Sequence, residues 1–371
     1  MARDTLKNLL QALSVSFSLW ATTFLSSGFA ATDTLCIQTF NAYGPAYSRN
    51  LEQRTAMLGD LLFKSPCEIV QLQEVWTESH HEMALKAIQR TLPFLSAARF
   101  DNFQSPSEGQ SGLSIFTSEG LSNQEFEKFK VNQDGLFDEI RDMLGVIKGI
   151  GASVISLRHD PARKLQMLNV HLHPSSTPVR IAQVTQLLEK IETMLPMQVP
   201  LILSGDFNFK PDSIEYSLLR DVANLTDSYL AIHKEYASSA CTYCPENPNH
   251  WEGVTGVIDY IFIGKSQNAI STPTSTSINL LGANGQSPSD HYGVRTYLQI
   301  SESPASTLSD SEFQNRRMKA IRTLDQALAI LKNNNISIEG LQEAIDRAQD
   351  YRRRIEENIP SDRFVEQLLL K

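Results

Sequence analysis

The stretch "VPLILSGDFN", residues Val199 to Asn208, has the composition of a buried strand that ends in polar side chains. Its first half is almost wholly apolar and has the length of a strand covered on both faces. Asp206 and Asn208 lie two residues apart, so in an extended chain their side chains point to the same side. A local Asx turn explains the pair equally well. The stretch therefore predicts a buried sheet with polar groups at a strand end.

Comparable apolar runs recur from residue 34 to residue 300, with helical patterns between several of them. The clearest helical pattern covers residues 181–195, with Thr177 as the expected N-cap and Pro178 at the first helical position. Some strand runs alternate between apolar and polar residues and others are apolar throughout, which suits two stacked sheets with helices outside. We therefore expect an α/β fold, a four-layer α/β/β/α sandwich. The runs are "TLCIQTF", "EIVQLQEV", "GLSIF", "ASVISL", "KLQMLNVHL", "VPLILSG", "VIDYIFI" and "GVRTYLQI".

Length and composition describe an ordinary globular chain of 371 residues, 41% of them hydrophobic, with a formal net charge of −9. The negative charge disfavours tight binding to a nucleic-acid backbone, although an enzyme can contact a few phosphates through metal ions. Residues 1–30 resemble a signal peptide, because Arg3 and Lys7 precede an apolar stretch that ends in small residues. We expect cleavage after Ala30 and a secreted or periplasmic protein.

Four cysteines fit an oxidising compartment, where they could form disulfides. Cys36 and Cys67 open two strand-like runs and form a plausible cross-strand pair. Cys241 and Cys244, in "CTYC", could form a tight bridge or a metal pair, but a second pair of zinc ligands at suitable spacing is missing.

The composition changes after the main domain, which we assign to residues 31–300. Residues 301–312, "SESPASTLSDSE", are predicted to be a linker. Residues 313–371 carry two helical patterns separated by "KNNN", and Ser337 is the expected cap of the second. They predict an antiparallel helical hairpin as a C-terminal tail. Its apolar positions are Ile321, Leu324, Leu328 and Leu331, followed by Ile338, Leu341, Ile345 and Ala348.

Polar residues lie at the end of nearly every predicted strand. Each has a local explanation by itself: Asn41 suits a turn, Glu74 could cap the following helix, and His171 could be a core histidine. Together they bring oxygen and imidazole groups to one rim of a sheet, where α/β folds tend to place ligand sites. Carboxylate and amide oxygens without a thiolate favour magnesium. The set is Asn41, Glu74, His171, His173, Asp206, Asn208, Asp259, Asp290 and His291.

In this order, the motifs resemble the endonuclease/exonuclease/phosphatase superfamily of metal-dependent phosphoesterases. The resemblance rests on a first strand ending in Asn41, on "QE" at Glu74, on "GDFN", on "DY" at Asp259 and on "SDH", and it covers about residues 35–300. It implies a DNase I-like sandwich. It also implies a magnesium ion, with manganese as an alternative, held by Glu74 with Asn41 and Asp290 close by.

The resemblance also implies roles for the other residues. Asp206 and Asn208 match the pair that binds and orients the nucleophile and the phosphate, and His171 matches a histidine that donates to a phosphate oxygen. His291 matches the general base, oriented by Asp259. A histidine held by a carboxylate can accept a proton from water near neutral pH. The residues alone leave open whether His291 or Asp206 takes that proton.

Within the superfamily the sequence most resembles the neutral sphingomyelinases. "QEVW", "SGLSIF", "NVHLHP" and "SDHYGV" are similar to stretches of that group. "IKGIG" places Lys148 where those enzymes carry a Lys-Gly on a loop near the phosphate, although a surface lysine explains it as well. The resemblance implies hydrolysis of sphingomyelin to ceramide and phosphocholine, with Lys148 and His173 binding substrate and a membrane surface as a candidate partner.

Three alternatives stay open. A secreted DNase-like endonuclease would use the same metal and histidines on nucleic acid, but "QEVW" and "NVHLHP" fit it less well. An inositol-phosphate phosphatase is disfavoured because few Lys and Arg residues lie beside the motifs. A catalytically inactive binding module is disfavoured by the intact polar set. For a membrane enzyme, residues 264–288 lack the paired aromatics that some bacterial sphingomyelinases insert into a bilayer; their apolar residues, which could instead form an edge strand, are Ile270, Ile278, Leu280 and Leu281.

Overall fold

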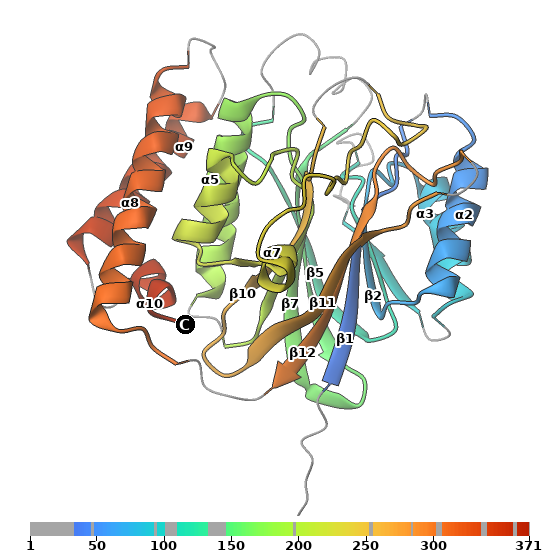
Figure 1. Ribbon diagram of the computed structural model, residues 1–371, viewed down its shortest axis with the longest axis horizontal. Coiled ribbons are helices and arrows are strands. Elements are labelled where there is room, and N and C mark those ends of the chain that lie inside the picture. Colours follow the sequence, from blue (N-terminus) through green and yellow to red (C-terminus); the bar gives the residue numbers. More distant parts are fainter. Residues whose placement is uncertain are drawn as a thin grey trace, which may run out of the picture. The chain divides into compact units, whose positions relative to one another are not determined.

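The computed structural model describes residues 33–45, 48–92, 95–100, 110–132, 146–195, 198–251, 255–282, 285–301, 306–334, 340–358 and 362–370. These residues form two six-stranded sheets with helices outside, which confirms the predicted four-layer sandwich (Figure 1). In strand order, the first sheet contains β11 (Ile270–Asn279), β12 (Gly293–Ser301), β1 (Asp33–Asn41), β2 (Ile69–Gln73), β4 (Ser114–Thr117) and β3 (Ser96–Arg99). The second contains β5 (Gly120–Lys128), β6 (Gly149–Leu157), β7 (Asp160–His171), β8 (Leu201–Asp206), β10 (Asp259–Gly264) and β9 (Thr226–Asp227).

Three apolar cores hold the layers together. One lies between the two sheets and includes Ile37 and Met167. A second joins the first sheet to α2 (Leu51–Lys64) and α3 (Glu78–Gln89) and includes Phe40. Ile37 and Phe40 serve different cores because neighbouring side chains of a strand alternate between its faces. The third core joins the second sheet to α5 (Thr177–Met194) and to the C-terminal helices.

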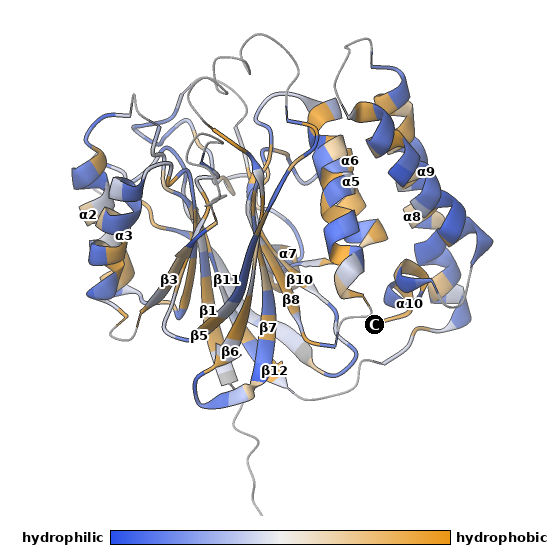
Figure 2. Cartoon of the chain, turned by 180° about the vertical axis from the view of Figure 1, so that it is seen from behind, coloured by the Kyte–Doolittle hydropathy of each residue, from blue (hydrophilic) through white to orange (hydrophobic). Residues whose placement is uncertain are grey.

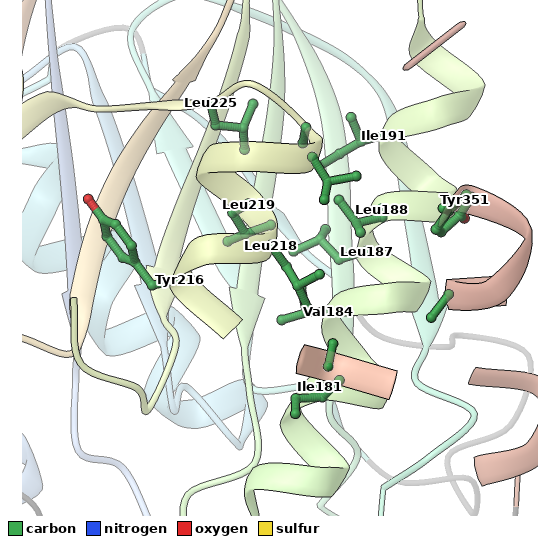
Figure 3. Packing of buried hydrophobic residues seen from close by; sticks show 14 of the residues in the cluster. Ile181, Val184, Leu187, Leu188, Ile191, Tyr216, Leu218, Leu219, Leu225 and Tyr351 are labelled. Carbon is green, nitrogen blue, oxygen red and sulfur yellow. The ribbon is translucent and has the colours of Figure 1, made fainter. Parts of the chain in front are cut away.

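Helix α5 is buried on several faces (Figure 3). Its predicted stripe over residues 181–191 is buried, and so is Leu187. The short α6 (Ile214–Ser217), the π-helix η2 (Leu218–Val222) and α7 (Ser228–His233) follow β8 in the chain. The predicted cap of α5 is wrong by one residue: Ser176 is the N-cap, because its backbone is still extended, and Thr177 already belongs to the helix.

The C-terminal tail forms the predicted helical hairpin and packs on α5. Helices α8 (Asp310–Lys332) and α9 (Leu341–Glu357) lie side by side, and a short α10 (Arg363–Leu369) follows (Figure 1). Leu324, Ala348 and Phe364 of the tail belong to the same core as α5, while α9 is hydrophilic along its outer face (Figure 2). The tail therefore adds a further helical layer outside α5.

The boundaries of the tail differ in detail from those expected. Helix α8 begins at Asp310, within the predicted linker of residues 301–312, because Ser309 and Glu312 form a capping box that starts the helix there. Ser337 and Ile338, expected at the start of the second helix, lie outside the described residues, as do residues 1–30 with the predicted signal peptide. Among the described residues, no helix has the length and apolar character needed to cross a membrane.

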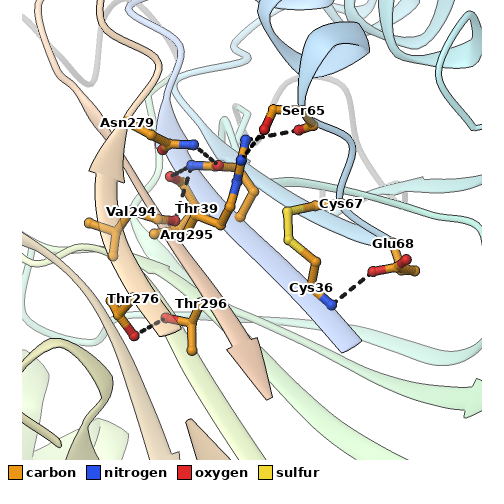
Figure 4. Close-up of a disulfide and its surroundings, with 11 residues drawn as sticks. Cys36, Thr39, Ser65, Cys67, Glu68, Thr276, Asn279, Val294, Arg295 and Thr296 are labelled. Atoms are coloured by element: carbon orange, nitrogen blue, oxygen red, sulfur yellow. Dashed lines mark hydrogen bonds between the residues drawn. A yellow bond between two sulfur atoms is a disulfide. The ribbon is translucent and has the colours of Figure 1, made fainter. Parts of the chain in front are cut away.

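Both expected cysteine pairs are disulfides. Cys36 in β1 is bonded to Cys67, which precedes β2 (Figure 4). Cys241 is bonded to Cys244, so "CTYC" is a bridge and not a metal pair.

The sequence patterns missed some strands. Strand β3 lacks branched residues, and β5 is largely exposed and polar. Ile278 lies in β11, an edge strand of the first sheet. This agrees with the edge strand that the sequence offered as an alternative to a membrane contact for this segment.

Candidate active site

Strand register places predicted site residues side by side. In the second sheet, β7 and β8 are parallel with His171 opposite Asp206, and β10 is antiparallel to β8 with Asp259 opposite Asp206. In the first sheet, Asn41 lies opposite the last residue of β2, directly before Glu74. The Asn41 Nδ2 atom donates to the Asp206 Oδ2 atom at 2.9 Å. This hydrogen bond joins the same rim of both sheets into one site.

Two histidines approach the same carboxylate oxygen. The His171 Nε2 atom lies 3.5 Å from Asp206 Oδ2 and 3.9 Å from Glu74 Oε1. The His291 Nε2 atom lies 3.7 Å from Asp206 Oδ2. The two imidazole nitrogens therefore converge on one point, as two groups that act on a single phosphate must.

His291 is held from its other side by Asp259. The His291 Nδ1 atom lies 2.9 Å from Asp259 Oδ2, and both side chains are buried. With Asp259 as the acceptor, Nδ1 carries the proton and Nε2 faces the site. Burial lowers the pKa of His291, but the carboxylates of Asp259, Asp206 and Asp290 outweigh it and raise that pKa well above its usual value.

The "SDH" motif is a compact hydrogen-bonded turn. The Ser289 Oγ atom accepts from the His291 backbone N–H at 3.1 Å and donates to Asp290 Oδ1 at 3.1 Å. One hydroxyl group thus fixes the backbone of His291 and the carboxylate of Asp290 together. Asp290 and His291, although adjacent in the chain, are therefore both held at the site.

Glu74 has a strained backbone at the end of β2. Its φ angle is +60°, in the left-handed region that non-glycine residues rarely adopt. Gly44 packs so closely that an added Cβ would lie 2.2 Å from the Glu74 carbonyl oxygen, so only glycine fits there. Glu74 does not cap the following helix, because Thr77 is the N-cap of α3. The local alternative for Glu74 is therefore wrong, and its carboxylate is free for the site.

The "GDFN" pair is arranged differently from the extended geometry expected. Asn208 has φ +53°, and its backbone N–H donates to Asp206 Oδ1 at 3.0 Å, which is an Asx turn. The Asn208 Nδ2 atom donates to the Leu172 carbonyl oxygen at 3.0 Å. Asp206 and Asn208 are therefore brought together by the turn and not by an extended chain. The Asx turn that the sequence offered as a local explanation is present, and the same two residues also lie at the site.

The site concentrates buried negative charge. Burial raises the pKa of Asp206 to about 6 and that of Asp290 to about 6, and it raises the pKa of Glu74 as well. Asp206, Asp259 and His291 each offer a ligand atom within 4.8 Å of the others, a candidate metal group that differs from the predicted ligand set of Glu74, Asn41 and Asp290. Oxygen donors that are costly to leave charged fit a hard divalent cation, which would remove that cost.

The two predicted substrate-binding residues have different surroundings. Lys148 is only 5% exposed, and its Nζ atom donates to the Leu172 carbonyl oxygen at 2.8 Å. Because it is buried, Lys148 is not a surface lysine. Its positive charge lies near Glu74 and Asp206 and partly offsets the rise in their pKa values that burial causes. The His173 Nδ1 atom accepts from the Ser176 backbone N–H at 3.0 Å, which shapes the turn before α5. Substrate contact by either residue stays a prediction.

Arg54 supports the site, and no sequence pattern pointed to it. From α2, its guanidinium donates to the carbonyl oxygens of Ala42 at 3.2 Å, Tyr43 at 2.7 Å and Pro288 at 3.1 Å. It therefore joins the loop after Asn41 to the loop before the "SDH" motif. An arginine inside an ordinary amphipathic helix gives no signal of such distant partners.

The region from residue 39 to residue 291 matches the Endonuclease/Exonuclease/phosphatase family. The chain belongs to this family. The match contains every predicted site residue from Asn41 to His291, and it confirms the resemblance found in the motifs.

Curated relatives in this family include sphingolipid phosphodiesterases. Inositol phosphosphingolipids phospholipase C of Schizosaccharomyces pombe is 23% identical over 303 residues, which are 73% of this chain and 69% of that protein. A putative neutral sphingomyelinase of Drosophila melanogaster is 28% identical over 204 residues, which are 52% of this chain and 43% of that protein. The chain thus matches less than half of the Drosophila relative.

Several solved structures share the fold of this chain. TDP2 of D. rerio, complexed with a single-strand DNA product, superimposes with a TM-score of 0.56 at 17% identity, over 72% of this chain and 99% of that one. A beta toxin mutant of Staphylococcus aureus with bound magnesium ions gives a TM-score of 0.54 at 15% identity, over 71% of this chain and 99% of that one. At such identities these matches establish the DNase I-like fold and not a substrate.

Proposed function

We propose that this family member is a magnesium-dependent phosphodiesterase acting on sphingophospholipids, with hydrolysis of sphingomyelin to ceramide and phosphocholine as its reaction. Phosphodiester chemistry is supported by one observation above all: His171 and His291 converge on Asp206 at the joined rim of the two sheets. A scaffold that only binds a partner has no need to bury these groups against one another.

The chain's own residues divide the work of hydrolysis. His171 would donate to a phosphate oxygen and stabilise the charge that develops there, and loss of one such donor typically costs on the order of 10² to 10³ in rate. Asn208 and Asp206 would orient the attacking water and the phosphate. His291, held by Asp259, would accept the proton of that water. In the cation-free site the neighbouring carboxylates raise the pKa of His291 well above its ordinary value, which favours the protonated form over the form that accepts a proton.

A divalent cation fits this donor set. Glu74, Asp290 and Asn41 are the residues that would hold it, next to Asp206. When bound, it would neutralise the carboxylates and a phosphate oxygen and would return the His291 pKa toward neutrality. The buried carboxylates with raised pKa values are the feature of this chain that supports the assignment.

A lipid substrate is favoured over nucleic acid. Both curated relatives described above carry sphingolipid names, and the net charge of −9 opposes binding along a phosphate backbone.

The test is release of phosphocholine from sphingomyelin in mixed micelles, with magnesium or with chelator. The wild-type protein is compared with His291→Ala, and with His159→Ala as a matched histidine control. His159 is exposed and lies in the turn before β7, at the end of the strand opposite His171. Supercoiled DNA and inositol phosphosphingolipid are offered in parallel.

Magnesium-dependent release that His291→Ala abolishes and His159→Ala leaves intact is the expected result. Turnover of inositol phosphosphingolipid without turnover of sphingomyelin would show that the substrate headgroup is phosphoinositol and not phosphocholine. Nicking of DNA without lipid turnover would move the substrate to nucleic acid. Magnesium binding without turnover of any of the three would leave the protein as a binding module.

We also propose export to an oxidising compartment, where the protein would reach such lipids. The two disulfides support this, because disulfides persist mainly in secreted and periplasmic proteins. Mass spectrometry of the protein recovered from its native cell tests it: an N-terminus at Ala31 and no free thiols are expected, whereas intact residues 1–30 with free thiols would refute it.

A further inference from the structure

We propose that the Cys241–Cys244 disulfide clamps Thr242 and Tyr243 against the His291–Asp259 pair, and that Tyr243 is a positioning residue for hydrolysis. The inference rests on the proposed function only in requiring that His291 acts in the reaction. "CTYC" then has a purpose beyond stability, since the two residues inside the bridge are those that touch the pair.

Thr242 holds the Asp259 side of the pair. It is fully buried, and its Oγ1 atom accepts from the backbone N–H groups of Ile258 at 3.0 Å and Asp259 at 3.2 Å. Its carbonyl oxygen accepts from the Tyr292 N–H at 2.7 Å. Thr242 therefore connects the start of β10 with the residue that follows His291.

Tyr243 holds the His291 side of the pair. Its ring lies 4.9 Å from the His291 imidazole, measured between centroids, at an interplanar angle of 47°. Its backbone N–H donates to Gly256 at 3.0 Å, and its hydroxyl donates to the Trp251 carbonyl oxygen at 3.0 Å and accepts from the Trp251 N–H at 3.1 Å. The backbone of Tyr243 and the hydroxyl end of its side chain are thereby both fixed, so the ring cannot move away while these bonds persist.

The rest of the loop encloses the "SDH" motif. The Asn249 Nδ2 atom donates to the carbonyl oxygens of Ser287 at 3.0 Å and Ser289 at 3.2 Å. The segment from Cys241 to Trp251 contains no helix or long strand, so its shape depends on these bonds and on the disulfide. A cross-link that closes so short a loop restricts the conformations that its two inner residues can adopt.

This arrangement predicts an effect on turnover more than on substrate binding. Displacing a catalytic group by about 1 Å can cost roughly 10²-fold in rate. An interaction that matters only while the proton moves lowers kcat and leaves KM nearly unchanged.

The experiment compares full-length Tyr243→Ala, Tyr243→Phe and the double variant Cys241→Ser/Cys244→Ser. Each is assayed for kcat and KM on sphingomyelin micelles and on the chromogenic diester bis(4-nitrophenyl) phosphate. The double variant Cys36→Ser/Cys67→Ser is the matched control, because that bridge lies near the opposite end of β1 from Asn41. The imidazole N–H resonance of His291, assigned with His291→Ala, is recorded by NMR as a readout that needs no substrate.

We expect Tyr243→Ala and the Cys241/Cys244 double variant to lose kcat by about 10- to 100-fold, with KM within about threefold and a shifted or lost His291 resonance. Tyr243→Phe keeps the ring and its backbone hydrogen bonds but loses the hydroxyl bonds to Trp251, so it should retain more of kcat than Tyr243→Ala does. The Cys36/Cys67 control should lower the melting temperature without lowering kcat of the folded protein.

The proposal is overturned if Tyr243→Ala keeps both kcat and the His291 resonance, or if the Cys36/Cys67 control loses as much kcat as the Cys241/Cys244 variant. Failure of the proposed substrate looks different. Wild-type protein would then cleave the chromogenic diester but not sphingomyelin, and if it cleaved neither, the resonance alone would decide the positioning role.

Discussion

Asp206 and Asp227 are both buried carboxylates of the second sheet, and burial raises the pKa of each. Their surroundings differ. Asp227 accepts from the Tyr216 hydroxyl at 2.9 Å, from the Tyr236 hydroxyl, and from backbone N–H groups at the start of α7. Asp206 is approached by two imidazoles and lies near other carboxylates. A buried acid with a raised pKa therefore indicates a site only where its neighbours, like the imidazoles beside Asp206, titrate near neutral pH.

Asp206→Asn gives the largest expected effect. It keeps the shape of the side chain but removes the charge on which His171 and His291 converge, so kcat should fall on the order of 10³-fold. The free energy of unfolding of the cation-free protein should not decrease, because a costly buried charge is lost. Steady-state kinetics and urea unfolding measure the two effects. Activity within tenfold of the wild type would place Asp206 outside the reaction.

Asp227→Ala should do the reverse. It leaves the hydroxyls of Tyr216 and Tyr236 and the Tyr229 N–H without their acceptor, and each unsatisfied buried group costs about 1–3 kcal/mol. Urea unfolding should show a loss on the order of 3 kcal/mol or more. The kcat of the fraction that stays folded should match the wild type. If Asp227→Ala lost as much kcat as Asp206→Asn, the structural role of Asp227 could not be separated from the catalytic role of Asp206.

The pH dependence of stability sharpens the same contrast. In the chelated protein the raised pKa of Asp206, about 6, keeps its carboxyl protonated up to about pH 6, whereas the unfolded carboxyl loses its proton near the ordinary value of 3.8. The native state thus binds more protons between these values, so stability falls as the pH rises through this window, on the order of 2 kcal/mol. Asp290 adds a change of the same sign. Thermal unfolding from pH 4 to pH 7 should show a flatter profile for Asp206→Asn, and an unchanged slope would contradict the assignment.

Tyr236→Phe is the mildest change. It removes one hydroxyl donor from Asp227 and keeps the ring stacked on Tyr229. Because Asp227 retains its other donors, the free energy of unfolding should fall by only about 1 kcal/mol, with no change in kcat. A chemical denaturation curve beside that of Asp227→Ala measures it. A loss as large as that of Asp227→Ala would show that this single hydroxyl carries the whole network.

Much of the site could be predicted because its residues occur at strand ends. Asn41, His171 and Asp206 end strands, and strand register then sets them side by side. Arg54 and Tyr243 could not be found in this way. Arg54 acts on a carbonyl 234 positions later in the chain, and Tyr243 acts through a loop without periodicity. Contacts of this kind leave no local pattern, because nothing near the residue in sequence is constrained by them.

The sequence by itself determined the sandwich and the rim on which the polar groups gather, because alternation of apolar residues and the chemistry of side chains are local properties. Only the tertiary structure decided that the two rims join through Asn41 and Asp206, that "GDFN" is an Asx turn, and that the C-terminal hairpin buries the outer side of α5. Each of these depends on which surfaces meet, and that is fixed by packing of the whole chain and not by any one segment.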